Sequence, residues 1–362
     1  MAMLTEPAIM DALRTVQEPE LGRDIVTLGM VRDVRITGMD VAFTIELTTP
    51  ACPLKDEIEA NVRSALGAIG AGEIAITWGA MVRRAAPSRP DALVPGVKNI
   101  IAVASGKGGV GKSTTTANLA LALAAEGANV GVLDADIYGP SQPTMLGIHG
   151  KPQSKDGKRI EPMEGHGVQA MSIGFMIDVE TPMVWRGPMV TQALEQLLNE
   201  TNWRDVDYLV VDLPPGTGDI QLTLAQRVPV TGALIVTTPQ DIALMDARKG
   251  LKMFEKVGIP ILGIVENMAM HTCTNCGHTE HIFGQGGGEK MAGEYEVEYL
   301  GGLPLDIRIR EQADSGRPTV VADPEGDLAA TYRKIARRVA VRIAERARDM
   351  SLKFPSIVVQ KT

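Results

Sequence analysis

The first 84 residues of the chain contain hydrophobic residues in two kinds of spacing, helical and alternating, which together predict a small α+β unit. Apolar side chains recur at helical spacing in some segments and at every second residue in others. Thr37-Gly38-Met39-Asp40 has the composition of a tight turn between two alternating segments. The expected elements are a helix over Ala8 to Val16, strands over Met30 to Ile36 and Val41 to Leu47, a helix from Pro53 to about Leu66, and a strand around Ile74 to Trp78.

The pattern changes after this unit. Residues 85–97 are rich in proline and charge without a regular apolar period, and we expect them to be a linker. From residue 98 to about 345, continuous apolar runs alternate with helical stretches, which predicts a doubly wound parallel sheet, an α/β fold. Residues 346–362 are expected to form a tail. The predicted strands are Ile100 to Ala104, Val130 to Leu133, Tyr208 to Val211, Ala233 to Val236 and Ile261 to Val265.

Composition narrows the class of protein. A length of 362 residues fits about two domains, and a net charge of -8 argues against general binding to nucleic acid. No apolar run is long enough to span a bilayer, and the N-terminus lacks the order of a secretory signal, so we expect a cytoplasmic protein. Three cysteines cannot build a disulfide scaffold, whereas Cys273 and Cys276 have the spacing of a metal or redox pair.

A phosphate-binding loop follows the strand that ends at Ala104. The motif G-x-x-x-x-G-K-[ST] begins at Gly106, and a helix is expected to follow this loop and to run to Glu126, with Gly127 ending it. Its glycines let backbone N–H groups approach phosphates, Lys112 reaches the terminal phosphates, and the Ser113 hydroxyl suits magnesium. The predicted nucleotide-binding residues are Gly106, Lys107, Gly108, Gly109, Val110, Gly111, Lys112, Ser113 and Thr114.

The additional lysine in this loop, Lys107, marks a deviant form of the motif. Gly-Lys-Gly-Gly-Val-Gly-Lys-Ser resembles the MinD, ParA and nitrogenase-iron-protein group. The resemblance implies an ATP-dependent homodimer in which Lys107 reaches the nucleotide of the partner subunit.

Carboxylates follow two further strands. Asp134 and Asp136 end one strand and Asp212 ends another, and carboxylates at strand ends are apt ligands for Mg²⁺. By the same resemblance, Asp136 positions the attacking water, Asp134 and Asp212 lie near magnesium, and the Gly216 amide senses the γ-phosphate.

The expected nucleotide is ATP. No Asn-Lys-x-Asp motif for reading guanine occurs in the C-terminal half of the chain. Asn267 and Pro304 match positions that contact or flank adenine in related ATPases, although the side chain of Asn267 could instead cap its own turn.

The thiol pair Cys273 and Cys276 allows three interpretations. Two thiolates are half of a tetrahedral set, so a symmetric dimer would supply the four sulfurs of an iron–sulfur cluster. Alternatively, His278 and His281 could complete a zinc site within one chain, although the spacing is cramped. The third interpretation is a buried or disulfide-forming pair.

Several motifs together resemble the Mrp/ApbC-type iron–sulfur carrier ATPases over nearly all of residues 98–345. They are Gly106 to Ser113, Asp136-Ile137-Tyr138-Gly139-Pro140-Ser141, Trp185-Arg186-Gly187-Pro188-Met189, Asp212 to Asp219, Glu266-Asn267-Met268, and the cysteine pair followed by His281-Ile282-Phe283-Gly284. The resemblance implies a four-iron four-sulfur (4Fe-4S) cluster bridged by Cys273 and Cys276 of two subunits.

Residues 1–84 look like the cluster-assembly domain fused ahead of many bacterial members. Its marker is Thr48-Thr49-Pro50-Ala51-Cys52-Pro53. Cys52 would cap the following helix, which favours its thiolate, and we consider it an accessory metal-binding or transfer thiol; the alternative is a half-buried cysteine that fills space.

These observations predict an ATP-hydrolysing homodimer that carries a labile 4Fe-4S cluster to apo-proteins and could receive it from scaffold proteins. The alternatives are a MinD- or ParA-like positioning protein and a reductase like the nitrogenase iron protein. The basic helix expected over Tyr332 to Arg348 could bind a membrane surface, but its apolar face lacks Trp and Phe, so we expect a helix docked on the protein and no stable membrane association.

Overall fold

A computed structural model describes residues 4–18, 23–47, 55–80, 82–85, 94–177 and 187–353. The chain forms two compact units that divide between Arg83 and Arg84. Among the described residues, no helix is both long enough and apolar enough to cross a membrane.

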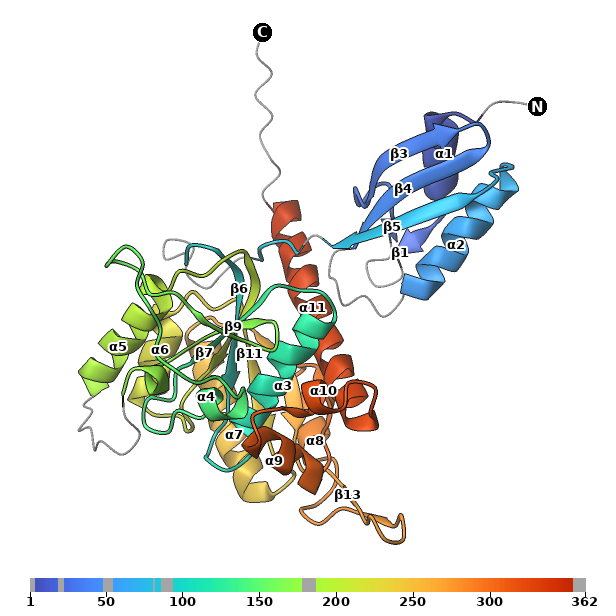
Figure 1. Cartoon of the computed structure of the whole chain (residues 1–362). Coiled ribbons are helices and arrows are strands. Elements are labelled where there is room, and N and C mark those ends of the chain that lie inside the picture. The colour runs from blue at the N-terminus through green and yellow to red at the C-terminus, as the bar shows by residue number, and fades with distance from the viewer. Residues whose placement is uncertain are drawn as a thin grey trace. The chain divides into compact units, whose positions relative to one another are not determined.

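The first unit packs helices on one small sheet (Figure 1). Strand β4 pairs antiparallel with β3 and parallel with β5, and buried residues of α1, α2 and β4 share one core. The elements are α1 (Glu6–Leu13), β1 (Gln17–Glu18), β2 (Arg23–Asp24), β3 (Val31–Thr37), β4 (Asp40–Leu47), α2 (Lys55–Ala68) and β5 (Ile74–Ala80).

The expected strands of this unit are confirmed, and the first helix differs at both ends. Helix α1 begins at Glu6 because proline is tolerated in the first helical turn, where Pro7 lies. It ends at Leu13, and Val16 reaches the core from a turn after the helix. The apolar pattern therefore extends beyond the helix that it predicts. Residues 53 and 54 lie outside the described part of the chain.

The second unit confirms the doubly wound α/β fold. Its sheet has the strand order β15-β12-β11-β6-β10-β7-β9-β8, parallel except for the β8–β9 pair. The strands are β6 (Val97–Ala104), β7 (Val130–Asp134), β8 (Met163–Gly165), β9 (Val168–Ser172), β10 (Val206–Asp212), β11 (Gly232–Thr237), β12 (Ile261–Glu266) and β15 (Tyr299–Gly302).

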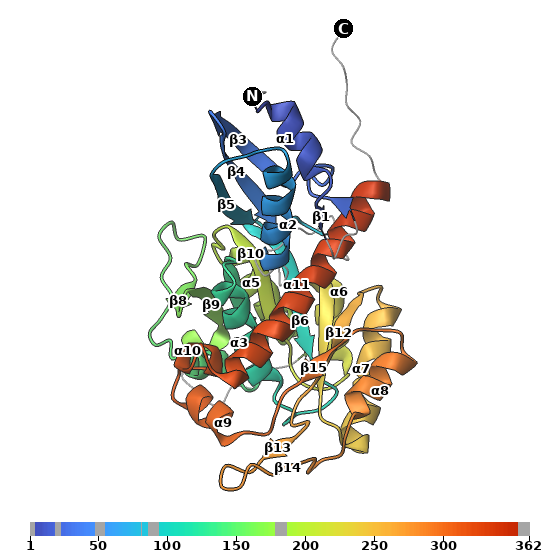
Figure 2. The ribbon, with the colours of Figure 1, turned by 90° about the vertical axis from the view of Figure 1, so that its right-hand side faces the viewer.

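Helices cover both faces of this sheet (Figures 1 and 2). Every second residue of β6, from Ile100 to Ala104, joins a core with α5, α7 and α8, while α3 packs over β6, β7 and β10 with α11 behind it. The helices are α3 (Lys112–Ala125), α4 (Gln142–Met145), the 3-10 helix η2 (Ile173–Phe175), α5 (Gly187–Glu200), α6 (Asp219–Arg227), α7 (Asp241–Lys256), α8 (Gly287–Glu294), α9 (Ile307–Asp314), α10 (Thr319–Ala322) and α11 (Asp327–Lys353).

Three strands of this sheet were not predicted from the pattern of apolar residues. Strands β8 and β9 form a short edge hairpin, and β15 contains two glycines and a single buried hydrophobic residue, Leu300. None of them forms a continuous apolar run like the other five strands: β8 and β15 are the edge strands, and β9 is interrupted by the half-buried Gln169. The sequence therefore predicts the centre of the sheet and misses its borders.

Helix α11 is docked on the second unit, as expected. Its buried residues recur at helical spacing and include Tyr332, Ile335 and Val339, and the Arg337 guanidinium lies 2.8 Å from Glu126 Oε1. The helix continues past residue 346, where the tail was expected to begin, to Lys353. The expected linker also has an ordered end, because the Ala85 amide donates to Asn99 Oδ1 (3.0 Å).

Candidate functional site

The phosphate loop and the acidic residues meet at the carboxyl edge of the sheet. Strand β10 lies between β6 and β7, and its last residue, Asp212, is in register with Val103 on one side and Asp134 on the other. Because parallel strands end at the same edge, the loop after β6 lies beside both carboxylates.

Two glycines of the phosphate loop are required by close packing. A Cβ on Gly106 would lie 2.2 Å from the carbonyl carbon of Asp246, and one on Gly111 would lie 2.1 Å from Asn267 Nδ2. Gly111 also has a φ of +81°, which favours glycine, and directly precedes α3. No side chain caps the first turn of α3, so its N–H groups are available to an anion.

Lys112 is held inside this site by Asp212. Its ammonium hydrogen-bonds to Asp212 Oδ1 and lies 3.2 Å from Ser113 Oγ, and both Lys112 and Asp212 are buried. Thr116 Oγ1 donates to the same carboxylate oxygen at 3.2 Å. The predicted lysine, serine and aspartate therefore form one connected cluster, aligned before any phosphate contact.

Asp134 lies beside this pair as a second buried carboxylate. Its Oδ2 accepts from the Ser141 and Gln142 amides (3.0 Å each) and from Ser172 Oγ (3.1 Å). Burial and the neighbouring Asp212 raise its pKa to about 7. Two carboxylates and a serine hydroxyl are oxygen ligands of the kind that a hard divalent cation prefers, so Asp134, Asp212 and Ser113 fit Mg²⁺.

Gln142 is a site residue that the sequence reasoning missed. Its Nε2 donates to Asp212 Oδ2 (2.9 Å) and to the Ser113 carbonyl (3.0 Å), while its backbone amide binds Asp134. Its Oε1 is buried and has no hydrogen-bond partner among the described residues. Its place in the chain, directly after the Asp136 to Ser141 motif, was the available signal in the sequence.

The remaining predicted catalytic and sensing groups border this cluster. Asp136 is half-buried, and burial raises its pKa against the opposing effect of Lys112. Lys107 is half-buried, and within the described residues its ammonium has no recorded ion pair. The Gly216 amide, predicted to sense phosphate, donates here to the Ser105 carbonyl (3.0 Å).

The two predicted adenine-contacting positions lie on neighbouring loops. Asn267 follows β12, and its Nδ2 donates to the Val110 carbonyl of the phosphate loop (2.9 Å). Pro304 is half-buried in the loop after β15, where the Leu303 amide donates to the Glu266 carbonyl (2.9 Å). Asn267 therefore joins two loops rather than capping its own turn.

The thiol pair lies on a hairpin that leaves the same edge. β13 (His271–Thr272) and β14 (Thr279–Glu280) are antiparallel, and the loop between them carries Cys273 and Cys276. The Cys273 amide donates to the His278 carbonyl and the Gly277 amide donates to the Cys273 carbonyl, both at 2.9 Å. Figures 1 and 2 show this hairpin projecting from the body of the second unit.

Local hydrogen bonds favour the thiolate at Cys273. The Cys276 and Asn275 amides, and then the Cys276 side chain, lower its pKa. Both cysteines are free, Cys273 half-buried and Cys276 exposed. The third interpretation was a buried or disulfide-forming pair. In the described structure the two cysteines are neither buried in the core nor disulfide-bonded, which argues against it.

The zinc interpretation has no assembled site in the described residues. No three His, Cys, Asp or Glu side chains converge there in a way that could hold a metal ion. His281 Nδ1 instead lies 2.7 Å from the Ala269 carbonyl, and His278 is exposed. The two sulfurs therefore project without histidine partners from their own chain.

Some predicted residues cannot be placed. Cys52, the accessory thiol, lies outside the described residues, as do Trp185 and Arg186 of one resembling motif.

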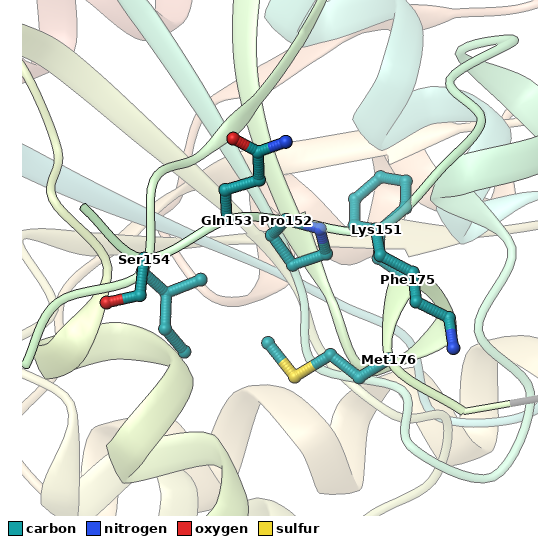
Figure 3. A pocket seen from close by; sticks show the side chains of 7 residues that line it. Lys151, Pro152, Gln153, Ser154, Phe175 and Met176 are labelled. Atoms are coloured by element: carbon teal, nitrogen blue, oxygen red, sulfur yellow. The ribbon is translucent and has the colours of Figure 1, made fainter. Parts of the chain in front are cut away.

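A separate pocket of about 290 Å³ has fewer ionisable side chains than the carboxyl edge of the sheet. It is lined by Lys151, Pro152, Gln153, Ser154, Ile160, Phe175 and Met176 (Figure 3). Among the described residues that line this pocket, Lys151 is the only one with a titratable side chain.

Comparison with known proteins identifies the family of this chain. Residues 96–340 match the ParA family model described as NUBPL iron-transfer P-loop NTPase, and residues 6–76 match the iron–sulfur cluster assembly protein family. An iron–sulfur cluster carrier protein of Salmonella typhimurium is 52% identical over 338 residues, 91% of this chain and 90% of the relative. One of Pseudomonas fragi is 64% identical over 256 residues, 69% of this chain and 89% of the relative.

A solved structure has the same fold. The nucleotide-binding protein of Archaeoglobus fulgidus in complex with ADP is 39% identical, covers 64% of this chain and 91% of its own, and superposes with a TM-score of 0.57. The resemblance drawn from the motifs is thereby confirmed, and the chain belongs to the family of NUBPL iron-transfer P-loop NTPases, with an iron–sulfur cluster assembly region ahead of the NTPase domain.

Proposed function

We propose that this protein is an ATP-hydrolysing carrier that holds a labile 4Fe-4S cluster between two subunits and delivers it to apo-proteins. The observation that carries the proposal is the placement of an incomplete pair of free thiols on an exposed hairpin, at the sheet edge that also bears the phosphate loop. The names of its relatives support the cargo.

The number of sulfur donors favours a homodimer. A 4Fe-4S cluster is held by four thiolates, and this hairpin offers two. A two-fold axis near the hairpins would bring the partner's pair to the same cluster. The lowered pKa of Cys273 favours the thiolate that binds iron. A reducing compartment such as the cytoplasm would keep these thiols free.

The second half of the proposal concerns nucleotide hydrolysis. Lys112 and the N–H groups at the start of α3 bind the phosphates, and Lys107 approaches the partner's nucleotide. Ser113, Asp134 and Asp212 are the residues that would hold Mg²⁺, which supplies charge neutralisation on the phosphates. Asp136, whose pKa is raised by burial, orients the attacking water.

Hydrolysis and cargo are coupled through the segments after β7 and β10. The segment after β7 binds both carboxylates through Gln142, and the segment after β10 is tied to the phosphate loop through the Gly216 amide and Ser105. Phosphate contacts that replace these bonds would move both segments and shift the subunits. Apo iron–sulfur proteins are the proposed recipients, and scaffold proteins are a possible source of the cluster.

Anaerobic purification with iron, sulfide and zinc analysis tests the cargo. We expect about four iron and four sulfide per dimer, lost in Cys273→Ser and Cys276→Ser but kept in Asn275→Ser, a change in the same loop. Cluster release to an apo-acceptor supports a carrier. A chromophore that stays bound and is reduced with ATP would indicate a reductase instead, and zinc or no metal would reject the cargo.

A further inference from the structure

The cysteine hairpin has few contacts of its own to fix its direction. Its strands β13 and β14 are two residues each, and every side chain from residue 274 to 282 is exposed. An isolated two-stranded hairpin is marginally stable in water. The position of the thiols therefore depends on the bonds at the base of the hairpin.

Two histidines make the side-chain bonds there, beside a backbone bond in which the Leu305 amide donates to the Met270 carbonyl (2.7 Å). His281 Nδ1 lies 2.7 Å from the Ala269 carbonyl, and His271 Nδ1 lies 3.0 Å from the Leu305 carbonyl. A carbonyl oxygen only accepts, so each Nδ1 carries a proton and donates it. One histidine thus ties the hairpin to the loop after β12, and the other ties it to the loop after β15.

The loop after β12 is itself bonded to the phosphate loop. Ala269 lies two residues beyond Asn267, whose Nδ2 donates to the Val110 carbonyl (2.9 Å) and whose backbone amide donates to Thr237 (2.7 Å). The Ala269 amide also donates to the Leu303 carbonyl (2.9 Å), which joins the loops after β12 and β15. Hydrogen bonds and short stretches of chain therefore lead from Val110 to both histidines.

We propose that His281 and His271 are positioning residues that couple the phosphate loop to the thiol pair, His281 by holding the cysteine hairpin on the loop that begins at Asn267 and His271 by holding it on the loop after β15. The inference rests on the proposed function for the roles of the nucleotide and the thiols. A shift of Val110 on phosphate binding moves Asn267, and the histidine bonds carry that shift to Cys273 and Cys276.

Thiol alkylation of the full-length, metal-free protein tests this coupling. The alkylation rates of Cys273 and Cys276 with iodoacetamide are measured with and without Mg-ATP by peptide mass spectrometry, and the Kd for ATP is measured separately. In the wild type we expect nucleotide to change the rate by about fivefold, the lower end of ordinary coupling between sites. In His281→Phe the change should fall close to none while the Kd stays the same.

Two variants control for a purely structural effect. His281→Asn should restore the nucleotide response, because its amide nitrogen is as many bonds from the backbone as Nδ1 and also donates. His278→Ala should respond as the wild type does, because its exposed ring lies in the same hairpin outside the bonded base. If His281→Phe does not fold, His271→Phe tests the second bond with the same expected loss.

Two results would overturn the inference. One is a wild-type protein that binds ATP but whose cysteines are alkylated at the same rate with and without it. The other is a histidine variant that lacks the bond and keeps the full response. Either result leaves the iron and sulfide analysis of the cysteine variants unaffected, so failure of this coupling is distinguishable from failure of the carrier function.

Discussion

The phosphate site and the cysteine hairpin lie on one edge of one sheet and are built in opposite ways. Lys112, Asp134 and Asp212 are buried, and their polar atoms are hydrogen-bonded to one another, to backbone amides and to neighbouring side chains. Cys273 and Cys276 lie in a short loop that is open to solvent. The comparison teaches that the phosphate site is preorganised inside the fold, whereas the proposed cluster site is open to solvent and offers only two of the four thiolates that a cluster needs. Changes in the first should reduce stability and activity together, and changes in the second should affect chemistry alone.

The largest expected effect follows from Lys112→Ala. It removes the partner of the buried Asp212 carboxylate, and breaking a buried ion pair costs about 3 kcal/mol. ATP hydrolysis should fall by about 100-fold or more, because a charge that stabilises the transition state is lost. Denaturant unfolding without nucleotide and a phosphate-release assay measure the two effects.

Lys107→Ala is the matched control for the stability part of that experiment. Its side chain is half-buried with no recorded ion pair in the described residues, so its free energy of unfolding should stay within about 0.5 kcal/mol of the wild type. If both variants lost the same free energy of unfolding, the ion pair of the buried Lys112 would not be what stabilises the fold.

Gln142→Ala should cost about 2 kcal/mol, because Asp212 Oδ2 and the Ser113 carbonyl lose a buried donor. Urea unfolding measures the change. Gln153→Ala, an exposed glutamine, should be neutral. A neutral Gln142→Ala would mean that the glutamine does not bind the carboxylate in solution.

The raised pKa of Asp134 gives the stability a defined pH dependence. Between about pH 4 and its folded pKa of about 7, the folded state binds a proton that the unfolded state releases. The contribution of this group to stability is therefore present at low pH and is lost as pH rises, with a slope of at most about 1.4 kcal/mol per pH unit.

Unfolding free energies measured from pH 5 to 7 test this dependence. Asp134→Asn should flatten the slope. Asp156→Asn should leave it unchanged, because hydrogen bonds from the Arg159 and Lys158 amides lower the pKa of that exposed carboxyl and it titrates below this window. Parallel slopes in the wild type and Asp134→Asn would show that another group is responsible.

The smallest effect is expected in the hairpin, from Gly277→Ala. Gly277 has a φ of +72° and no neighbour within 4 Å of a Cβ, so the change strains the turn without a clash. The amides that stabilise the Cys273 thiolate should move, and alkylation of Cys273 at neutral pH should slow by about threefold.

Global stability should barely change in Gly277→Ala, since the turn is exposed. A large loss in the free energy of unfolding would show that the hairpin is part of the core and would remove the contrast with the phosphate site.

Much of this protein could be predicted before any coordinates. The central strands were predictable because they are buried on both faces and form continuous apolar runs, whereas the edge strands β8 and β15, and β9 beside β8, lack that pattern. The phosphate loop was predictable because its chemistry requires particular residue types within nine consecutive positions. Gln142 was not, because a buried glutamine has no sequence period and its partners come from two other strands.

The sequence by itself determined the residue chemistry: a lysine and a serine at a strand–helix junction, carboxylates at strand ends, and two closely spaced thiols. Only the tertiary structure decided which of them meet. Strand order places Asp134 beside Asp212, and backbone carbonyls in the loops after β12 and β15 bind His281 and His271. Side-chain identity is local information, whereas a hydrogen bond between segments depends on how the strands are ordered and where each loop turns.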